Sequence, residues 1–276
     1  MLRTTMLWLA IAAAVVACVP AVFWFAQDRL IFFPQPVAST KHLPPHAEPL
    51  AMRAPDGTML HGWFVPAANR PSPVVLYFGG NGEEVSWALA DGRWPRDVAL
   101  AALNYRGYGT SEGKPSAEAL ESDGLALFDL VAARGDVDRE RIAVFGRSLG
   151  TAVATHVAAH RPVERAILVS PYDSLAAVGQ GHYPFLPVSW LLRHRFAPAG
   201  EAATIRAPLL ALVAPADAII PVAHSRALYD AWSGPKDWVE VAGADHNTLG
   251  ATREFWGAVR TFLAPHPARL PAPPPR

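Results

Sequence analysis

The residues with the clearest chemical potential lie at positions 146–150, where the sequence reads Gly-Arg-Ser-Leu-Gly. In a G-x-S-x-G pattern the serine sits on a sharp turn between a strand and a helix, and the glycines keep neighbouring backbone clear of that turn. The apolar run 142–145 leads into the pattern, and an alanine-rich stretch at 151–159 follows it. The pattern and its context predict that Ser148 is a nucleophile.

A serine hydroxyl attacks efficiently only when a base removes its proton and an acid orients that base. His246 lies in a loop directly after the last predicted strand, and Asp217 follows the predicted strand at 208–214. Loops at the carboxyl ends of parallel strands collect at one edge of a sheet. We therefore expect His246 to be the base and Asp217 the orienting acid, with Asp173 as the alternative acid.

A developing oxyanion needs two backbone N–H groups aimed at it. The residue after the nucleophile, Leu149, is expected to supply one. The glycine-rich loop 79–82 follows an apolar strand, and we expect Asn81 to supply the other. The same loop could begin a dinucleotide site, but that pattern requires a third glycine where the sequence has Val85. We therefore predict no nucleotide cofactor.

Metal chemistry has weaker support in the sequence. His156 and His160 are four residues apart on one predicted helix, but a zinc-protease pattern requires glutamate where the chain has Val157. We interpret the two histidines as residues of a helix face and predict no metal site. The single cysteine, Cys18, permits no internal disulfide and no cysteine-based metal cage.

These side chains need a scaffold, and the chain supplies one by alternating apolar strands with longer helical patterns. Nearly continuous apolar strands are typical of a parallel sheet buried on both faces. We predict strands at 59–65, 74–78, 98–104, 142–146, 166–170, 208–214 and 238–242, and helices at 83–93, 117–134, 148–160, 222–232 and 248–263. The alternation predicts one α/β domain over 50–264, with a mostly parallel central sheet and helices on both faces.

Three stretches interrupt this alternation. Residues 171–207 are too long for a simple connection and contain their own apolar helix, which favours a small cap over the site, although an extra packing helix is equally compatible. Residues 27–49 are proline-rich and are predicted to form a stalk. The proline-rich tail at 265–276 is predicted to be extended or disordered.

The N-terminal segment 6–26 carries no charged residue. Its length of roughly 31 Å as a helix, at about 1.5 Å per residue, matches a hydrocarbon core about 30 Å thick. We predict a single helix that spans a bacterial inner membrane. Arg3 is expected on the cytoplasmic side and the domain outside the cytoplasm. A cleaved signal peptide, or lipoprotein processing at Cys18 in Val-Val-Ala-Cys, remains the alternative.

The composition excludes several classes of protein. The chain has 276 residues, of which 51% are hydrophobic and 17% charged, so it is not a disordered or coiled-coil protein. Twenty-four basic and twenty-four acidic residues give a formal net charge of zero. Without a basic stripe, no nucleic-acid partner is predicted.

Taken together, the motifs resemble those of the α/β-hydrolase superfamily. More narrowly, they are similar to its single-span, membrane-anchored serine hydrolases, akin to serine aminopeptidase-like and depalmitoylase-like members. The resemblance covers about residues 30–263. It is carried by residues 77–82, 104–113 and 146–150, and is extended by 30–34, 170–174, 183–187 and Asp217-x-x-x-Pro221.

The resemblance implies that Ser148 is the nucleophile, that Asp217 and His246 are its partners, and that Asn81 and Leu149 form the oxyanion hole. The chain order Ser, Asp, His is the order of α/β-hydrolases. Gly79 departs from the pattern, because many relatives carry a histidine there that supports the loop. The departure puts the local geometry of the loop in doubt.

The expected function is hydrolysis of a carboxylic ester or thioester, with an amide as a further option, through an acyl-enzyme. The apolar cap and the predicted anchor favour an acyl or lipid-like substrate and contact with the membrane. No cofactor is expected. The alternative is a catalytically silent, membrane-anchored binding module of the same fold.

Overall fold

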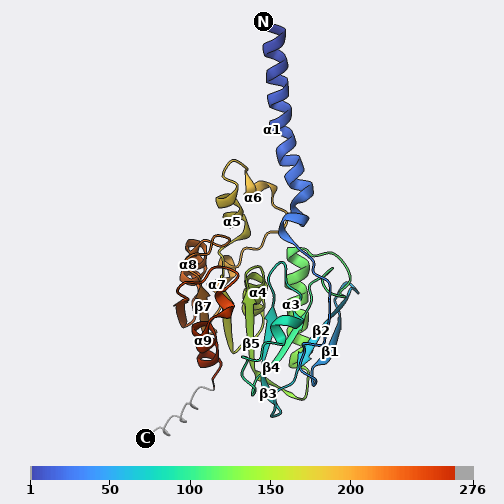
Figure 1. Cartoon of the computed structure of the whole chain (residues 1–276), viewed down its shortest axis with the longest axis vertical. Helices are drawn as coiled ribbons and strands as arrows, with labels where there is room; N and C mark the ends of the chain where they lie inside the picture. Colours follow the sequence, from blue (N-terminus) through green and yellow to red (C-terminus); the bar gives the residue numbers. More distant parts are fainter. Residues whose placement is uncertain (1, 265–276) are drawn as a thin grey trace.

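The computed structural model describes residues 2–264, apart from the side chains of residues 2, 3, 7 and 9–17. The predicted tail at 265–276 lies outside the described residues. Figure 1 shows one α/β body with a long N-terminal helix, α1, extending away from it.

The body is built on an eight-stranded sheet with the order β1-β2-β4-β3-β5-β6-β7-β8. The strands are β1 (Glu48–Arg53), β2 (Met59–Val65), β3 (Ser72–Phe78), β4 (Ala99–Leu103), β5 (Val137–Arg147), β6 (Arg165–Val169), β7 (Leu209–Val213) and β8 (Lys236–Glu240). Strands β3 to β8 run parallel, whereas β1 and β2 pair antiparallel at one edge. The predicted mostly parallel sheet is confirmed. Strand β1, in which exposed and buried residues alternate, lies outside the predicted strands.

Helices cover both faces of the sheet. The helices of the described chain are α1 (Leu2–Ile31), α2 (Ser86–Leu89), α3 (Ala117–Ala132), α4 (Gly150–His160), α5 (Leu175–His182), α6 (Val188–Leu191), α7 (Ala199–Ala202), α8 (Val222–Ala231) and α9 (Arg253–Leu263), with a 3₁₀ turn at Leu249–Ala251. Alternate residues of β3 enter opposite cores, as the twofold period of a strand requires. Leu76 packs with α3 and α4, whereas Val75 packs with α2 and α9.

The prediction of a helix at 83–93 is wrong, because only Ser86–Leu89 is helical. Glu83 instead accepts a hydrogen bond from the Gly80 N–H, at 2.9 Å, and Glu84 accepts one from the Asn104 side chain, at 2.9 Å. Glu83 therefore stabilises the preceding loop, and Glu84 joins this segment to the end of β4. At the other end, the Asp91 side chain accepts from the Arg93 N–H and closes a turn.

The segment 171–207 contains α5, α6 and α7, and the first two lie beside the C-terminal turns of α1 (Figure 1). We call residues 175–192 the cap. Leu186, Val188 and Leu192 of the cap form a small apolar cluster with Phe23 and Ile31 of α1. The cap therefore packs on the N-terminal helix as well as on the domain.

The predicted stalk at 27–49 begins inside a helix, because α1 continues to Ile31. Phe32, the next residue, is buried in the main core. Across the described part of the chain, no helix has both the length and the apolar character that crossing a membrane requires. The side chains at 7 and 9–17, in the predicted span 6–26, lie outside the described residues. The membrane anchor therefore stays a prediction.

Candidate active site

Ser148 lies on the turn between β5 and α4, with a φ of 51°. A non-glycine residue in this left-handed region is strained, and such strain is typical of a nucleophile at a sharp strand-to-helix turn. The two flanking glycines are required by close contacts. A Cβ at Gly146 would lie 2.5 Å from the Gly150 carbonyl oxygen, and one at Gly150 would lie 2.1 Å from the Phe78 carbonyl oxygen.

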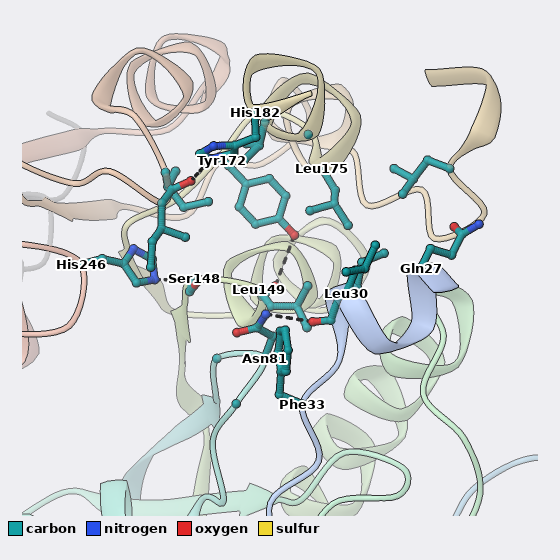
Figure 2. Close-up of a pocket in the computed structure, with 18 of the residues that line it drawn as sticks. Gln27, Leu30, Phe33, Asn81, Ser148, Leu149, Tyr172, Leu175, His182 and His246 are labelled. Carbon is teal, nitrogen blue, oxygen red and sulfur yellow. Dashed lines mark hydrogen bonds between the residues drawn. The ribbon is translucent and has the colours of Figure 1, made fainter. Parts of the chain in front are cut away.

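Three side chains from three strand ends form a continuous hydrogen-bonded series. The Ser148 hydroxyl donates to Nε2 of His246, with 3.1 Å between Oγ and Nε2. Nδ1 of His246 in turn donates to Oδ2 of Asp217, at 2.8 Å. All three residues are buried, and Figure 2 shows the His246 ring facing Ser148 at the wall of a pocket. The structure thus brings together the three residues that the sequence analysis selected.

Asp217 is held as a carboxylate that orients the imidazole. Burial raises the pKa of Asp217, but the hydrogen bonds from His246 and from the Ile220 N–H outweigh this effect and hold its pKa below the usual value. Its Oδ1 also accepts from the N–H groups of Ile219, at 2.9 Å, and Ile220, at 2.7 Å. Because Nδ1 of His246 keeps its proton toward Asp217, Nε2 is free to accept the serine proton.

The alternative acid, Asp173, lies in a different network. Its Oδ1 is 2.9 Å from Nδ1 of His224 and accepts a hydrogen bond from the Ser174 N–H. The structure therefore places Asp217, and not Asp173, next to His246.

Asn81 and Leu149 lie beside Ser148 in the wall of the same pocket (Figure 2). The Asn81 side-chain amide donates to the Ile31 carbonyl oxygen at 2.8 Å. The backbone carbonyl of Asn81 accepts from the Phe33 N–H at 2.9 Å. The Tyr108 hydroxyl donates to the same Asn81 carbonyl. Bonds from α1 and from the Tyr108 turn thus fix the loop that we expect to supply an oxyanion donor.

Gly79 occupies a position where many members of the family that the sequence resembles carry histidine. The loop at Gly79 is supported in another way. The Gly79 carbonyl oxygen accepts a hydrogen bond from the buried Tyr105 hydroxyl at 2.9 Å. Arg147, which the sequence analysis left without a role, also stabilises the site. Its guanidinium pairs with Glu83 and donates to the His246 carbonyl, both at 3.3 Å. The only sequence signal for this role is its position next to Ser148.

The pocket is a cavity of about 480 Å³ with walls from two further regions. One wall comes from the cap. The other comes from α1 and the residues after it, which the sequence analysis had assigned to an anchor and a stalk. The lining residues of this second wall are Phe23, Gln27, Leu30, Ile31 and Phe33.

A possible metal-ligand cluster lies elsewhere on α4. Ligand atoms of His156, His160 and Glu201 lie within 4.8 Å of one another. Glu201 comes from α7, so no local pattern joins it to the histidine pair. Nδ1 of His156 is already hydrogen-bonded to Glu201 at 2.9 Å, and none of the three residues lines the pocket at Ser148.

No family model matches the sequence. The chain is 37% identical over 261 residues to the uncharacterized protein Rv2307c of Mycobacterium tuberculosis, covering 92% of this chain and 93% of the relative. It is 33% identical over 222 residues to protein YfhR of Salmonella typhi, covering 74% and 75% of the two chains. It is also 28% identical over 229 residues to the α/β-hydrolase domain-containing protein WAV2 of Arabidopsis thaliana, covering 74% of each.

Solved structures share the fold at lower sequence identity. An esterase from Pyrococcus furiosus superposes with a TM-score of 0.66 at 17% identity, covering 84% of this chain and 96% of that one. An acetyl xylan esterase from Paenibacillus superposes with a TM-score of 0.64 at 20% identity, covering 88% and 92%. With the parallel sheet, the strained serine turn and the named relatives in agreement, the chain belongs to the α/β-hydrolase superfamily.

Proposed function

We propose that this hydrolase is a serine hydrolase that cleaves carboxylic esters or thioesters through an acyl-enzyme. The observation that carries the proposal is the unbroken hydrogen-bonded series from Asp217 through His246 to Ser148. Such a series activates a serine that is otherwise a weak nucleophile.

In the first half of the reaction, Oγ of Ser148 attacks the substrate carbonyl carbon while its proton passes to Nε2 of His246. The carbonyl oxygen becomes an oxyanion, and the N–H groups of Leu149 and Asn81 stabilise it. Collapse of this intermediate breaks the bond to the alcohol or thiol, which leaves with the proton from His246. Asp217 stabilises the imidazolium that exists between these two transfers.

In the second half, a water molecule gives its proton to His246 and attacks the acyl-enzyme. The new oxyanion collapses, the acid product leaves, and His246 returns the proton to Ser148. The cycle consumes one water and requires no cofactor. An amide substrate would follow the same steps with an amine as the leaving group.

We further propose an acyl or lipid-like substrate and attachment to a membrane through residues 6–26. The apolar cavity walls from α1 and the cap support the first proposal, and the absence of charge in the segment supports the second. The domain would then face the outside of a bacterial inner membrane. Lipid attachment at the exposed Cys18 is the alternative mode of anchoring.

A fluorophosphonate probe, which reacts with activated serines, tests the proposed chemistry. We expect it to label the wild type and the control Ser233→Ala, an exposed serine away from the pocket, but not Ser148→Ala. Ser148→Ala should also lose turnover of p-nitrophenyl esters while keeping its circular dichroism spectrum. Equal labelling of Ser148→Ala and wild type would refute the proposal, and an unlabelled, folded wild type would favour the silent binding module.

A further inference from the structure

The N-terminal helix forms part of the active-site pocket. Phe23, Gln27, Leu30 and Ile31 all line the cavity that contains Ser148. Their spacing of four, seven and eight residues from the first places them on one face of a helix. An anchor that only tethered the domain would not need to place one face in the catalytic cavity.

The cap supplies the opposite wall of the cavity. Its contribution is mostly apolar and comes from Leu175, Val178, Val188 and Leu192. Figure 2 shows Leu175 on the cap side of the pocket and Leu30 on the α1 side, with Ser148 and Leu149 at the catalytic end. We call this space the α1–cap groove. It is polar at the serine and apolar along its length, as a site for the acyl part of an ester would be.

Polar contacts hold the two walls of the groove together. Gln27 has 0% of its surface exposed, and it donates to the Leu191 carbonyl at 3.2 Å while accepting from the Arg193 N–H at 2.7 Å. The next residue, Asp28, pairs with His194 at 2.8 Å and with the Arg193 guanidinium at 2.5 Å. Because buried polar groups require partners, these bonds fix the cap against α1 and set the width of the groove.

The outer surface of the same two elements is unusually apolar. Phe185 and Trp190 of the cap are 75% and 82% exposed, and Val22 and Phe25 of α1 are 65% and 81% exposed. The cap and the exposed part of α1 project from the same end of the domain (Figure 1). Exposed apolar surface of this kind marks an interaction site, and tryptophan favours the boundary between lipid and water.

Charge at this end of the molecule favours a lipid partner over an apolar protein surface. Arg29 is exposed on α1, four residues after Phe25, and Arg195 is exposed three residues after the cap. Arg193, between the cap and Arg195, is also exposed but pairs with Asp28. Basic residues beside an apolar, aromatic surface complement the anionic headgroups of a phospholipid leaflet.

We propose that the α1–cap groove is an acyl-chain binding site that opens onto a phospholipid surface, with Phe185 and Trp190 seated among the headgroups. The acyl chain leaves the lipid along α1, and its carbonyl reaches Ser148 at the inner end. The inference rests on the proposed hydrolase function and adds the source and path of the substrate. It gives α1 a second role, as a wall that selects the acyl chain.

Contact with lipid is tested by a fluorescent probe on the full-length protein. Acrylodan is attached to Phe185→Cys in a Cys18→Ser background, and the protein is reconstituted into vesicles of phosphatidylcholine and phosphatidylglycerol. We expect blue-shifted emission that is quenched by headgroup nitroxide lipids. The matched control is Trp87→Cys, since Trp87 is 62% exposed on α2. Equal, unquenched emission at the two positions would overturn the docking surface.

The groove is tested by filling it. Leu30 lines the cavity but is 48% exposed, so Leu30→Trp narrows the groove with little disturbance of the core. We expect the ratio of kcat/KM for dodecanoyl against acetyl p-nitrophenyl ester to fall by about tenfold, a usual effect of altered pocket size. Leu192→Trp, on the opposite wall, should shift the ratio in the same direction. The control Leu263→Trp, at the end of α9, should leave the ratio unchanged.

The acyl-chain site and the hydrolase function can be refuted separately. If the fluorophosphonate labels Ser148 but neither groove variant changes the chain-length ratio, the acyl-chain site is wrong and the serine hydrolase stands. If Ser148 is not labelled, the proposed function itself is wrong.

Discussion

The catalytic residues and the substrate groove are held in different ways. Ser148, Asp217 and His246 are buried, and the loops around them are fixed by backbone N–H donors and by Arg147. The groove is bounded by two segments more than 140 residues apart in the sequence, with partly exposed apolar walls joined by few polar bonds. The sheet therefore positions the catalytic residues, whereas the proposed selection of the substrate depends on how the cap meets α1.

The largest expected effect falls on the catalytic side. Asp217→Asn removes the charge that orients His246, and we expect kcat to fall by about 10³- to 10⁴-fold with little change in KM. Asp173→Asn is the matched control, because Asp173 bonds His224 instead. Steady-state kinetics on a soluble ester measures both. A larger loss in Asp173→Asn would transfer the acid role to that residue.

A smaller effect is expected where the two regions meet. The Tyr108 hydroxyl accepts from the Phe33 N–H at 2.9 Å and donates to the Asn81 carbonyl, so it joins the end of α1 to the oxyanion loop. Tyr108→Phe should lower kcat by about ten- to a hundredfold through a displaced loop. Tyr229→Phe, a partly buried tyrosine on α8, is the control. An unchanged kcat would show that the Asn81 bonds to Ile31 and Phe33 hold the loop without the Tyr108 hydroxyl.

On the groove side, Gln27→Ala should lower the stability of the fold. The change leaves the Leu191 carbonyl and Arg193 N–H without their partner, so we expect the free energy of unfolding to fall by about 1–3 kcal/mol. Labelling of Ser148 by the fluorophosphonate should persist. Denaturant unfolding measures the first effect, with the exposed Gln35→Ala as control. Loss of labelling would contradict the separation of the two regions.

The smallest effect concerns acid. The pKa of Asp217 is lower in the folded protein than in the unfolded chain, so its ionised form stabilises the fold above the unfolded value of about 3.9. This contribution is lost as the pH falls through the lower, folded pKa. Denaturant unfolding between about pH 5 and pH 2 should therefore show a shallower loss of stability in Asp217→Asn than in wild type. Parallel curves would contradict the assignment of the shift to Asp217.

Much of the sheet could be predicted, because a buried parallel strand is a local apolar run. The run before Ser148 and the one before Asp217 both became strands, β5 and β7. The exceptions have physical reasons. Strand β1 alternates exposed and buried residues at the sheet edge. The helix predicted at 83–93 is shorter because Glu83 bonds to Gly80 in the preceding loop and Glu84 bonds to Asn104 after β4.

The sequence by itself determined the order of the candidate catalytic residues and the turn that exposes the serine. Strand periodicity and the glycines at 146 and 150 are properties of short, contiguous segments. Only the tertiary structure decided that Asp217 rather than Asp173 meets His246, and that one face of α1 forms a wall of the pocket. Both depend on contacts between distant segments, which are set by packing of the whole chain and leave no local pattern in the sequence.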